Sequence, residues 1–307
     1  MKAKLNDFLP DASAPASAAV AAGMQAWGDF RMISPEDIKL LFKSREPFSH
    51  KGSYGHALII AGAAETMGAA LLCAMGCLHA GAGLTTAAIP GSGLTALNTL
   101  LPEVMYADRK SLDQAKDFKR YNAIAIGPGL LPAAGGNWKD LTLIEALRAS
   151  KQPVIADADM LSLLAKNNQH FRHLAKDSIL TPHVKEFDRL FGEQENWWDR
   201  IQTAVEQARK RKITIVLKNR YTFVIDAEGA VYINPTGNPA MAQGGMGDVL
   251  TGIITAYVAQ NYTARDAAIL GCYFHGLAGD QLANTHFNVS ASQLALQLPK
   301  TIKDFFG

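Results

Sequence analysis

Short, uniformly apolar segments recur along the chain and alternate with longer stretches of helical pattern. The apolar segments lie at residues 57–61, 123–127, 153–157, 179–182 and 213–218, and each ends at or beside Gly, Asp, Pro or Lys. Apolar strands separated by helices are typical of a mostly parallel sheet with helices on both faces. The pattern therefore predicts an α/β fold.

Polar and glycine positions set the other expected elements. Strands at 221–227 and 231–234 flank Glu228-Gly229, which predicts a hairpin. Ser34 and Pro35 have the pattern of a helix start, and a helix is expected from about Gly68 to His79. Residues 245–306 are almost wholly helical in pattern. We expect residues 1–30 to form a poorly ordered or docking tail and residues 31–307 to form one domain beginning near Ser34.

Composition excludes several partners. The 30 basic and 28 acidic residues are well mixed and leave a formal charge of +2, so neither a nucleic-acid nor a membrane partner is expected. Three cysteines form no disulfide pattern and are expected to be core residues. Asp7 and Pro10 interrupt the Ala-rich N-terminus, and no apolar run reaches membrane-spanning length. A cytoplasmic location is expected, with export as the alternative.

The segment at residues 234–259 carries the strongest chemical signal. Its GGMG sequence, residues 244–247, directly precedes an apolar helix, where glycine allows backbone N–H groups to point into one concavity. Such a helix start favours an anion. Asp248 follows in the first turn, where it either caps the helix or accepts a proton from a hydroxyl group next to a bound phosphate.

Other candidate residues follow the predicted strands. Ligands bind at the carboxyl ends of parallel strands, so the site is expected to collect residues 127–129, Asp157, Asp159, 183–186, 218–222 and the loop after Asn234. Asp157 and Asp159 are interpreted as site-lining or capping groups, since no third metal ligand accompanies them. Lys51 is either part of a lid over the anion or an exposed loop residue.

Eight segments together resemble the ADP/ATP-dependent NAD(P)H-hydrate dehydratases of the ribokinase-like superfamily. They occur in family order at residues 49–62, 68–72, 81–84, 126–130, 157–161, 180–190, 216–222 and 234–248. The sequence departs from the family pattern at four positions, Val184, Asn219, Gln243 and Met246. The resemblance implies a ribokinase-like three-layer sandwich with a mostly parallel central sheet and helices on both faces.

The resemblance also implies an activity and a set of roles. Family members return hydrated NADH or NADPH to the reduced dinucleotide, with ADP or ATP as co-substrate and Mg²⁺ as cofactor. Asp248 is implied as the catalytic base, and Glu186 as a Mg²⁺ ligand through water. Substrate contacts are implied at Ala69, Gly129, His183 and Asp248, and nucleotide contacts at Lys218, Asn219, Arg220, Tyr221, Thr222, Gly245, Met246 and Gly247. A homo-oligomer is implied, and epimerase activity is expected to be absent because only about 30 residues precede the body.

Two other hypotheses remain open from the sequence. A ribokinase-like kinase of a small alcohol or vitamin precursor would share the glycine-rich loop and Asp248. A non-catalytic nucleotide-binding protein would need the loop alone. The combination of residues 49–55, 157–161 and 181–186 favours the dehydratase.

Overall fold

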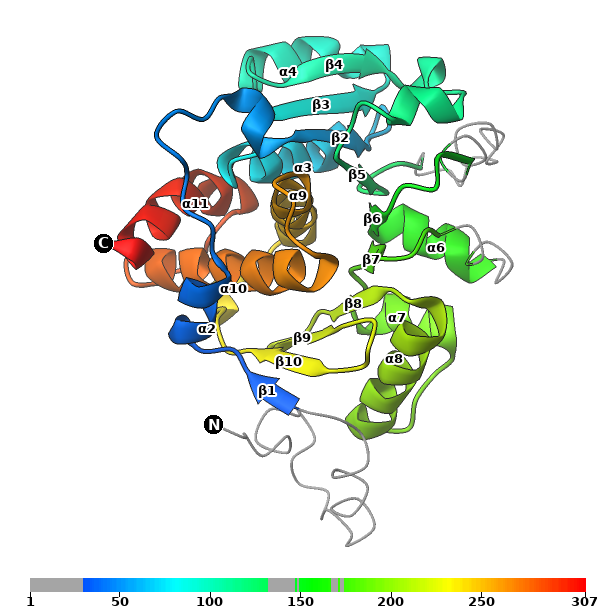
Figure 1. Ribbon diagram of the computed structural model, residues 1–307, viewed down its shortest axis with the longest axis vertical. Helices are drawn as coiled ribbons and strands as arrows, with labels where there is room; N and C mark the ends of the chain where they lie inside the picture. The colour runs from blue at the N-terminus through cyan, green and yellow to red at the C-terminus, as the bar shows by residue number, and fades with distance from the viewer. Residues whose placement is uncertain (1–29, 132–146, 148, 167–170, 172–173) are drawn as a thin grey trace, which may run out of the picture.

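A ten-stranded sheet organises the chain in the computed structural model, which describes residues 30–131, 147, 149–166, 171 and 174–307 (Figure 1). Of the predicted tail at residues 1–30, residues 1–29 lie outside the described residues, and Phe30 begins strand β1. The strand order is β1-β10-β9-β8-β7-β6-β5-β2-β3-β4. The strands are β1 (Phe30–Met32), β2 (His56–Ile60), β3 (Leu84–Ile89), β4 (Met105–Asp108), β5 (Ala123–Ile126), β6 (Val154–Ala156), β7 (Ile179–Leu180), β8 (Thr214–Leu217), β9 (Thr222–Ile225) and β10 (Val231–Asn234).

Most neighbouring strands run parallel, as predicted. The exceptions are the β8–β9 and β9–β10 pairs, which are antiparallel. The predicted hairpin is confirmed, since Ile225 pairs with Val231 and Gly229 adopts a φ of +83° in the turn. β1 pairs parallel to β10, so the sheet begins upstream of Ser34.

Helices cover both faces of the sheet, which gives three layers (Figure 1). Ser34 caps the first helix through the amide of Asp37, as its sequence predicts. The helices are α2 (Pro35–Leu41), α3 (Met67–His79), α4 (Leu94–Leu100), α6 (Ala158–Lys166), α7 (Val184–Phe191), α8 (Trp197–Arg211), α9 (Met246–Ala259), α10 (Ala264–Ala283) and α11 (Ala291–Phe306). Within the described residues, no helix is long and apolar enough to span a bilayer.

Alternate strand residues face the two helical layers. In β2, Ala57 and Ile59 pack into the core under α3, α9, α10 and α11, whereas Leu58 and Ile60 pack against the side that holds α6, α7 and α8. The period of two residues follows from the strand geometry. Because both faces are covered, the strands are apolar throughout, which is the pattern that predicted them.

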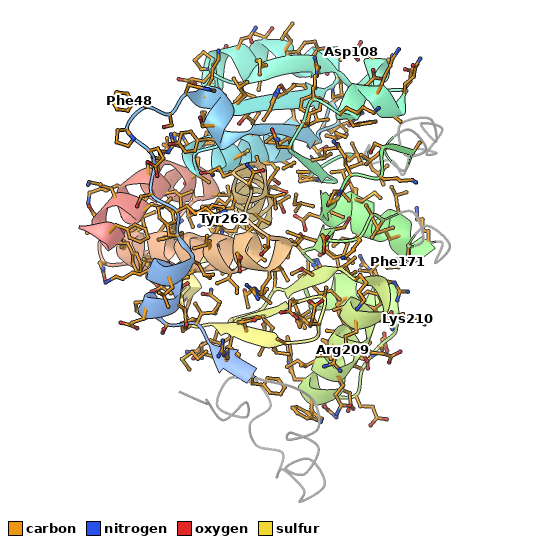
Figure 2. The ribbon with its side chains drawn as sticks, viewed as in Figure 1. Phe48, Asp108, Phe171, Arg209, Lys210 and Tyr262 are labelled. Carbon is orange, nitrogen blue, oxygen red and sulfur yellow. The ribbon has the colours of Figure 1, made fainter. Side chains whose placement is uncertain are left out.

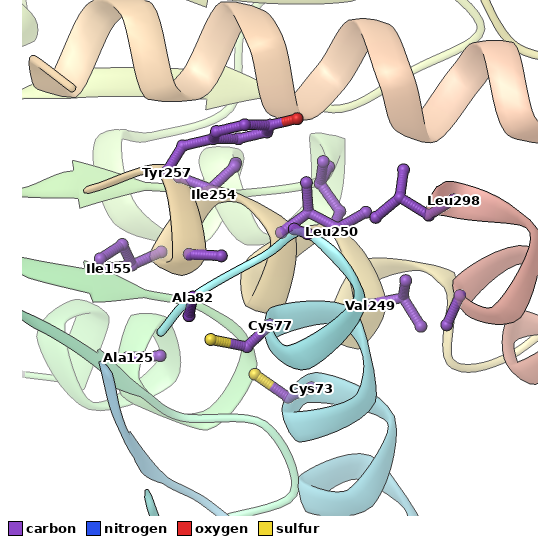
Figure 3. Packing of buried hydrophobic residues seen from close by; sticks show 14 of the residues in the cluster. Cys73, Cys77, Ala82, Ala125, Ile155, Val249, Leu250, Ile254, Tyr257 and Leu298 are labelled. Carbon is purple, nitrogen blue, oxygen red and sulfur yellow. The ribbon is translucent and has the colours of Figure 1, made fainter. Parts of the chain in front are cut away.

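Helix α3 packs closely against α9 (Figure 3), and α9 also contacts strands β2, β5 and β6. A Cβ atom added to Gly252 of α9 would lie 2.0 Å from the carbonyl oxygen of Cys73, and one added to Gly76 of α3 would lie 2.4 Å from the carbonyl oxygen of Val249. Glycine therefore sets the distance between the two helices. The three cysteines are buried free thiols, as expected.

Candidate active site

The glycine-rich residues 244–247 lie at the start of α9 and form the candidate anion-binding loop, which contains a left-handed residue. Gly245 is the N-cap, with a φ of +90°, and its carbonyl accepts the amide of Val249. A side chain at this position would be strained and would also meet Leu72 at 2.5 Å. The free amides at this end of the helix provide the partial positive charge that favours a phosphate.

Met246, which departs from the family pattern, directs its side chain into the core. The residue is buried and belongs to the same apolar cluster as α3 and α9. Because the side chain points inward, only the backbone of Met246 is needed at the anion-binding loop. This arrangement explains how a large apolar residue fits among three glycines.

Asp248 lies in the first turn of α9 and is half-buried. Burial, together with the nearby carboxylates of Asp157, Asp159 and Glu186, raises its pKa to about 7, although the Lys218 ammonium opposes the shift. A carboxylate with a pKa near neutrality is suited to accept a proton from a hydroxyl group. The N-cap Gly245 has no side chain, and among the described residues the Asp248 carboxylate accepts no backbone amide at this helix end, so Asp248 does not act as a cap.

Lys218 joins this loop to the end of β8. Its ammonium donates to Asp157 Oδ1 at 2.9 Å, and the Nζ atom lies 3.2 Å from the position that a Cβ atom on Gly247 would occupy. Burial alone would lower the pKa of Lys218, but Asp157, Glu186 and Asp248 outweigh it and raise the pKa. Lys218 is therefore a cation held beside the anion-binding loop.

His183 and Glu186 form a capping box at the start of α7. The His183 amide donates to Glu186 Oε2 at 2.9 Å, and the Glu186 amide donates to His183 Nδ1 at 3.3 Å. The parallel bridge between His183 and Lys218 brings this helix start to the same edge of the sheet as Asp157. Half of the His183 side chain remains exposed, so its ring is available to a ligand.

Backbone and small side chains form the neighbouring part of the site, after β2 and β5. Gly127 and Gly129 adopt φ angles of +129° and +53°. A Cβ atom on Gly129 would lie 2.9 Å from that of Ala69, and the Gly129 carbonyl accepts the Thr66 hydroxyl at 2.7 Å. Gly68 is different, because no neighbouring atom lies within 4 Å of a Cβ atom added there. Tight packing therefore does not account for Gly68.

A cavity of about 480 Å³ opens beside Lys218, between the loop after β8, the loop before α9, and α10. Six of the predicted nucleotide-binding residues line it, and the remaining two, Tyr221 and Gly245, do not. Tyr221 packs against the core instead. The six residues are Lys218, Asn219, Arg220, Thr222, Met246 and Gly247.

Sequence reasoning missed the wall that α10 contributes. Cys272, His275 and Gly276 line the cavity, and His275 Nε2 lies 3.1 Å from the carbonyl oxygen of Met246. Burial lowers the pKa of His275 to about 4, so the ring is neutral and donates to that carbonyl. A single histidine on an apolar helix gives no signal in the sequence that separates a cavity residue from a core residue.

Lys51 does not reach this site, which corrects the lid hypothesis. It begins the 3₁₀ helix at Lys51–Tyr54, directly before β2, and its carbonyl oxygen lies 1.7 Å from the position of a Cβ atom on Gly83, before β3. It therefore lies at the amino ends of parallel strands, opposite the site. Phe48, in the loop that precedes this 3₁₀ helix, is fully exposed (Figure 2).

Residues 57–303 match a family profile described as NAD(P)H-hydrate dehydratase. The chain belongs to this dehydratase family. An ADP-dependent (S)-NAD(P)H-hydrate dehydratase from Lactiplantibacillus plantarum is 33% identical over 275 residues, which cover 89% of this chain and 97% of the relative. A bifunctional NAD(P)H-hydrate repair enzyme from Thermofilum pendens is 34% identical over 84% of this chain and 52% of its own length. The chain thus spans about half the length of the bifunctional relatives that it matches.

A solved structure of a dehydratase-family enzyme has the same fold. It is the ADP/ATP-dependent NAD(P)H-hydrate dehydratase from Bacillus subtilis, co-crystallised with ATP and Mg²⁺, and it is 30% identical with a TM-score of 0.77. The match covers 90% of this chain and 98% of that chain. The ribokinase-like three-layer fold predicted from the sequence is therefore confirmed.

Proposed function

We propose that this chain is a nucleotide-dependent dehydratase that returns hydrated NADH or NADPH to the reduced dinucleotide with ADP, or alternatively ATP, as co-substrate. The observation that carries the proposal is the position of Asp248, whose pKa is raised to about 7, beside the anion-binding loop and the Lys218 ammonium. The family of the chain supports the choice of substrate.

The proposed reaction has two chemical stages. Asp248 accepts the proton of the hydroxyl group at ring carbon 6 while the hydroxyl oxygen attacks the terminal phosphorus, and AMP leaves from ADP or ADP leaves from ATP. The lone pair of the ring nitrogen then expels phosphate, and loss of a proton from the neighbouring carbon restores the double bond. Phosphorylation is needed because hydroxide is a poor leaving group and phosphate a good one.

We assign different roles in this reaction to different site residues. The amides at Gly245, Met246 and Gly247, together with Lys218, stabilise charge on the transferring phosphoryl group. We assign the nucleotide to the cavity that Asn219, Arg220 and Thr222 line, with Tyr221 supporting the loop from the core side. We assign the hydrated dinucleotide to the part of the site next to Ala69, Gly129 and His183.

The proposal includes a Mg²⁺ ion that Glu186 would hold through water. Among the described residues, no group of three or more His, Cys, Asp or Glu side chains could hold a metal ion by itself. Mg²⁺ in phosphoryl-transfer sites commonly takes one or two carboxylates, with water and phosphate oxygens completing its shell. Glu186, which interacts electrostatically with Lys218 and Asp248, fits that limited role through water. When bound, the ion would neutralise phosphate charge.

The decisive experiment is a spectrophotometric assay at the absorbance band of the reduced nicotinamide. Purified protein is mixed with hydrated NADPH or NADH and with ADP, ATP or no nucleotide. We expect the absorbance to recover only when nucleotide is present. Absence of recovery with either nucleotide contradicts the proposal, and a phosphorylated product that accumulates in step with nucleotide consumption supports the kinase of a small alcohol instead.

Two further expectations remain predictions. We propose a cytoplasmic location and a homo-oligomer, of which the second is testable by the molar mass of the purified protein in light scattering. A monomer over the working concentration range would contradict the homo-oligomer.

A further inference from the structure

Asp157 occupies a junction of three elements behind the anion-binding loop. It follows β6 directly and is only 2% exposed. Its Oδ1 atom accepts the Lys218 ammonium at 2.9 Å, and its Oδ2 atom accepts the Thr251 hydroxyl at 2.8 Å. One carboxylate thus connects the end of β6, the loop after β8 and helix α9.

The two partners of Asp157 both lie next to proposed reaction groups. Thr251 is fully buried and follows Asp248 by three residues, so the two side chains lie on neighbouring turns of one side of α9. Lys218 lies 3.2 Å from the position of a Cβ atom on Gly247. A lysine ammonium has three donors, and Asp157 uses one of them. The remaining donors are available to a phosphate in the loop.

The backbone around Asp157 is also fixed by its neighbours. A Cβ atom on Gly127 would lie 1.9 Å from the Asp157 carbonyl oxygen, and the Asp157 amide donates to Ile126 at 3.1 Å. Ala158, the next residue, has a φ of +48°, a conformation that strains a residue with a side chain. Strained backbone that the surrounding structure maintains occurs preferentially at functional sites.

We propose that Asp157 is a positioning residue that holds the Lys218 ammonium at a fixed distance from the anion-binding amides of α9, to which it is bound through Thr251. This inference rests on the proposed phosphoryl transfer. A purely structural ion pair is the competing explanation. Such a pair is weak evidence for stability, because its removal from water costs about as much as the attraction returns.

Three variants test the proposal. Asp157→Asn keeps the shape but removes the charge, Thr251→Val keeps the shape but removes the hydroxyl group, and Thr251→Ser restores that hydroxyl group. We expect Asp157→Asn to lower kcat about tenfold and to raise the KM for ADP severalfold, in line with the loss of one charge-assisted contact. Thr251→Val is expected to show a smaller loss of kcat, about threefold, and Thr251→Ser is expected to recover it.

Each variant has a matched control. Asp188→Asn removes the negative charge that pairs with Arg200. The Arg200 guanidinium donates to the two carboxylate oxygens of Asp188 at 2.9 and 3.0 Å, and this pair joins α7 to α8. Thr255→Val removes a buried hydroxyl group one turn beyond Thr251, which donates to the Thr251 carbonyl at 2.6 Å. We expect both controls to lower the melting temperature while kcat stays within about twofold of the wild type, since neither side chain contacts Asp157, Lys218 or Asp248.

Turnover and binding are measured separately so that the two proposals can fail independently. An unchanged kcat and KM in folded Asp157→Asn overturns the positioning role, as does a loss in Thr251→Val that Thr255→Val reproduces or Thr251→Ser does not recover. If Asp157→Asn does not fold, the threonine series decides. If the wild type has no turnover, the proposed function fails. Calorimetric titration with ADP then tests the positioning role by itself, which requires that Asp157→Asn and Thr251→Val bind ADP more weakly than their controls.

Discussion

The candidate site has two halves, the cavity beside Lys218 and the surface after β2 and β5, and they are built from different kinds of groups. Around the cavity, between the loop after β8 and helix α10, the lining includes residues with long or polar side chains, among them Lys218, Arg220 and His275. After β2 and β5, backbone and the smallest side chains form the surface, with left-handed glycines at 127 and 129. A cavity wall that includes long side chains and a surface of backbone and small residues should respond to mutation in different ways.

Asp248 lies between the two halves, and its loss is expected to have the largest effect. Asp248→Asn removes the proton acceptor but keeps the size of the side chain. We expect kcat to fall by about 10²–10⁴, the usual contribution of a general base, while ADP binding persists. Steady-state kinetics and ADP titration measure the two quantities.

The matched control for Asp248 is a first-turn aspartate in another helix. Asp266 lies in the first turn of α10, capped by Thr263, away from the cavity lining. Asp266→Asn should leave kcat unchanged. If Asp248→Asn and the wild type had the same kcat, Asp248 would not be catalytic, and only nucleotide binding would remain as a function for this edge of the sheet.

The pH dependence follows from the raised pKa of Asp248. The carboxylate must be deprotonated to act as a base, so kcat/KM should decrease about tenfold for each pH unit below a pKa of about 7 and level off above it. Initial rates over a pH series measure the profile. A kcat/KM that stays constant from neutral pH down to about pH 5 would show that Asp248 is not the base.

Stability gives an independent readout of the same group. Because the folded-state pKa of Asp248 lies above the ordinary value of 3.8, the folded protein retains this proton as the pH rises from about 4 to about 7, and its contribution to stability decreases over that window. Asp248→Asn should therefore melt at a higher temperature than the wild type at about pH 8. The difference should disappear near pH 4.

The backbone half is tested by adding a single methyl group. Gly127→Ala forces a side chain onto a φ of +129° and places its Cβ atom 1.9 Å from the Asp157 carbonyl oxygen. Gly192→Ala carries comparable strain, at a φ of +94°, but meets nothing within 4 Å. We expect Gly127→Ala to cost about 1–3 kcal/mol more of unfolding free energy than Gly192→Ala, measured by denaturant titration. Equal costs would mean that the loop after β5 can move.

The sequence predicted the fold because its local patterns agreed with one another. Apolar runs after helical stretches identified β2 and β5 to β8, and Glu228-Gly229 identified the hairpin. β1 and β4 are not buried throughout and include the charged residues Arg31 and Asp108, so neither forms an unbroken apolar run, and β3 contains the buried polar residues Thr85 and Thr86. Short or polar strands acquire their structure from pairing with neighbours, which a local pattern cannot reveal.

The site residues were predictable from the sequence where they directly follow a strand or lie at the start of a helix. The contacts of Asp157 were not, because Lys218 is 61 residues away and Thr251 is 94 residues away. His275 was missed because only the packing of α10 against the loop before α9 places it at the cavity. For Lys51 the lid hypothesis was wrong and the exposed alternative agrees with the structure, because a lysine beside glycine has the same local pattern at either end of a strand.

The side-chain half should show the smallest effect when one exposed group is removed. Arg220 lines the cavity and is exposed, with its guanidinium 5.5 Å from the centre of the Tyr221 ring. An exposed charge contact is worth at most about 1 kcal/mol, so Arg220→Ala should raise the KM for ADP by about threefold to fivefold and leave kcat unchanged. The effect should shrink as salt is added, because screening weakens exposed charges.

An arginine on the opposite layer provides the comparison. Arg209 of α8 is likewise exposed, and its Nε atom donates to the Glu228 carbonyl at 2.7 Å, away from the cavity (Figure 2). Arg209→Ala should leave the KM for ADP unchanged at every salt concentration. If Arg220→Ala instead lowered kcat about tenfold, as Asp157→Asn is expected to do, the cavity would tolerate substitution as little as the glycine loops, and the distinction between the two halves would no longer hold.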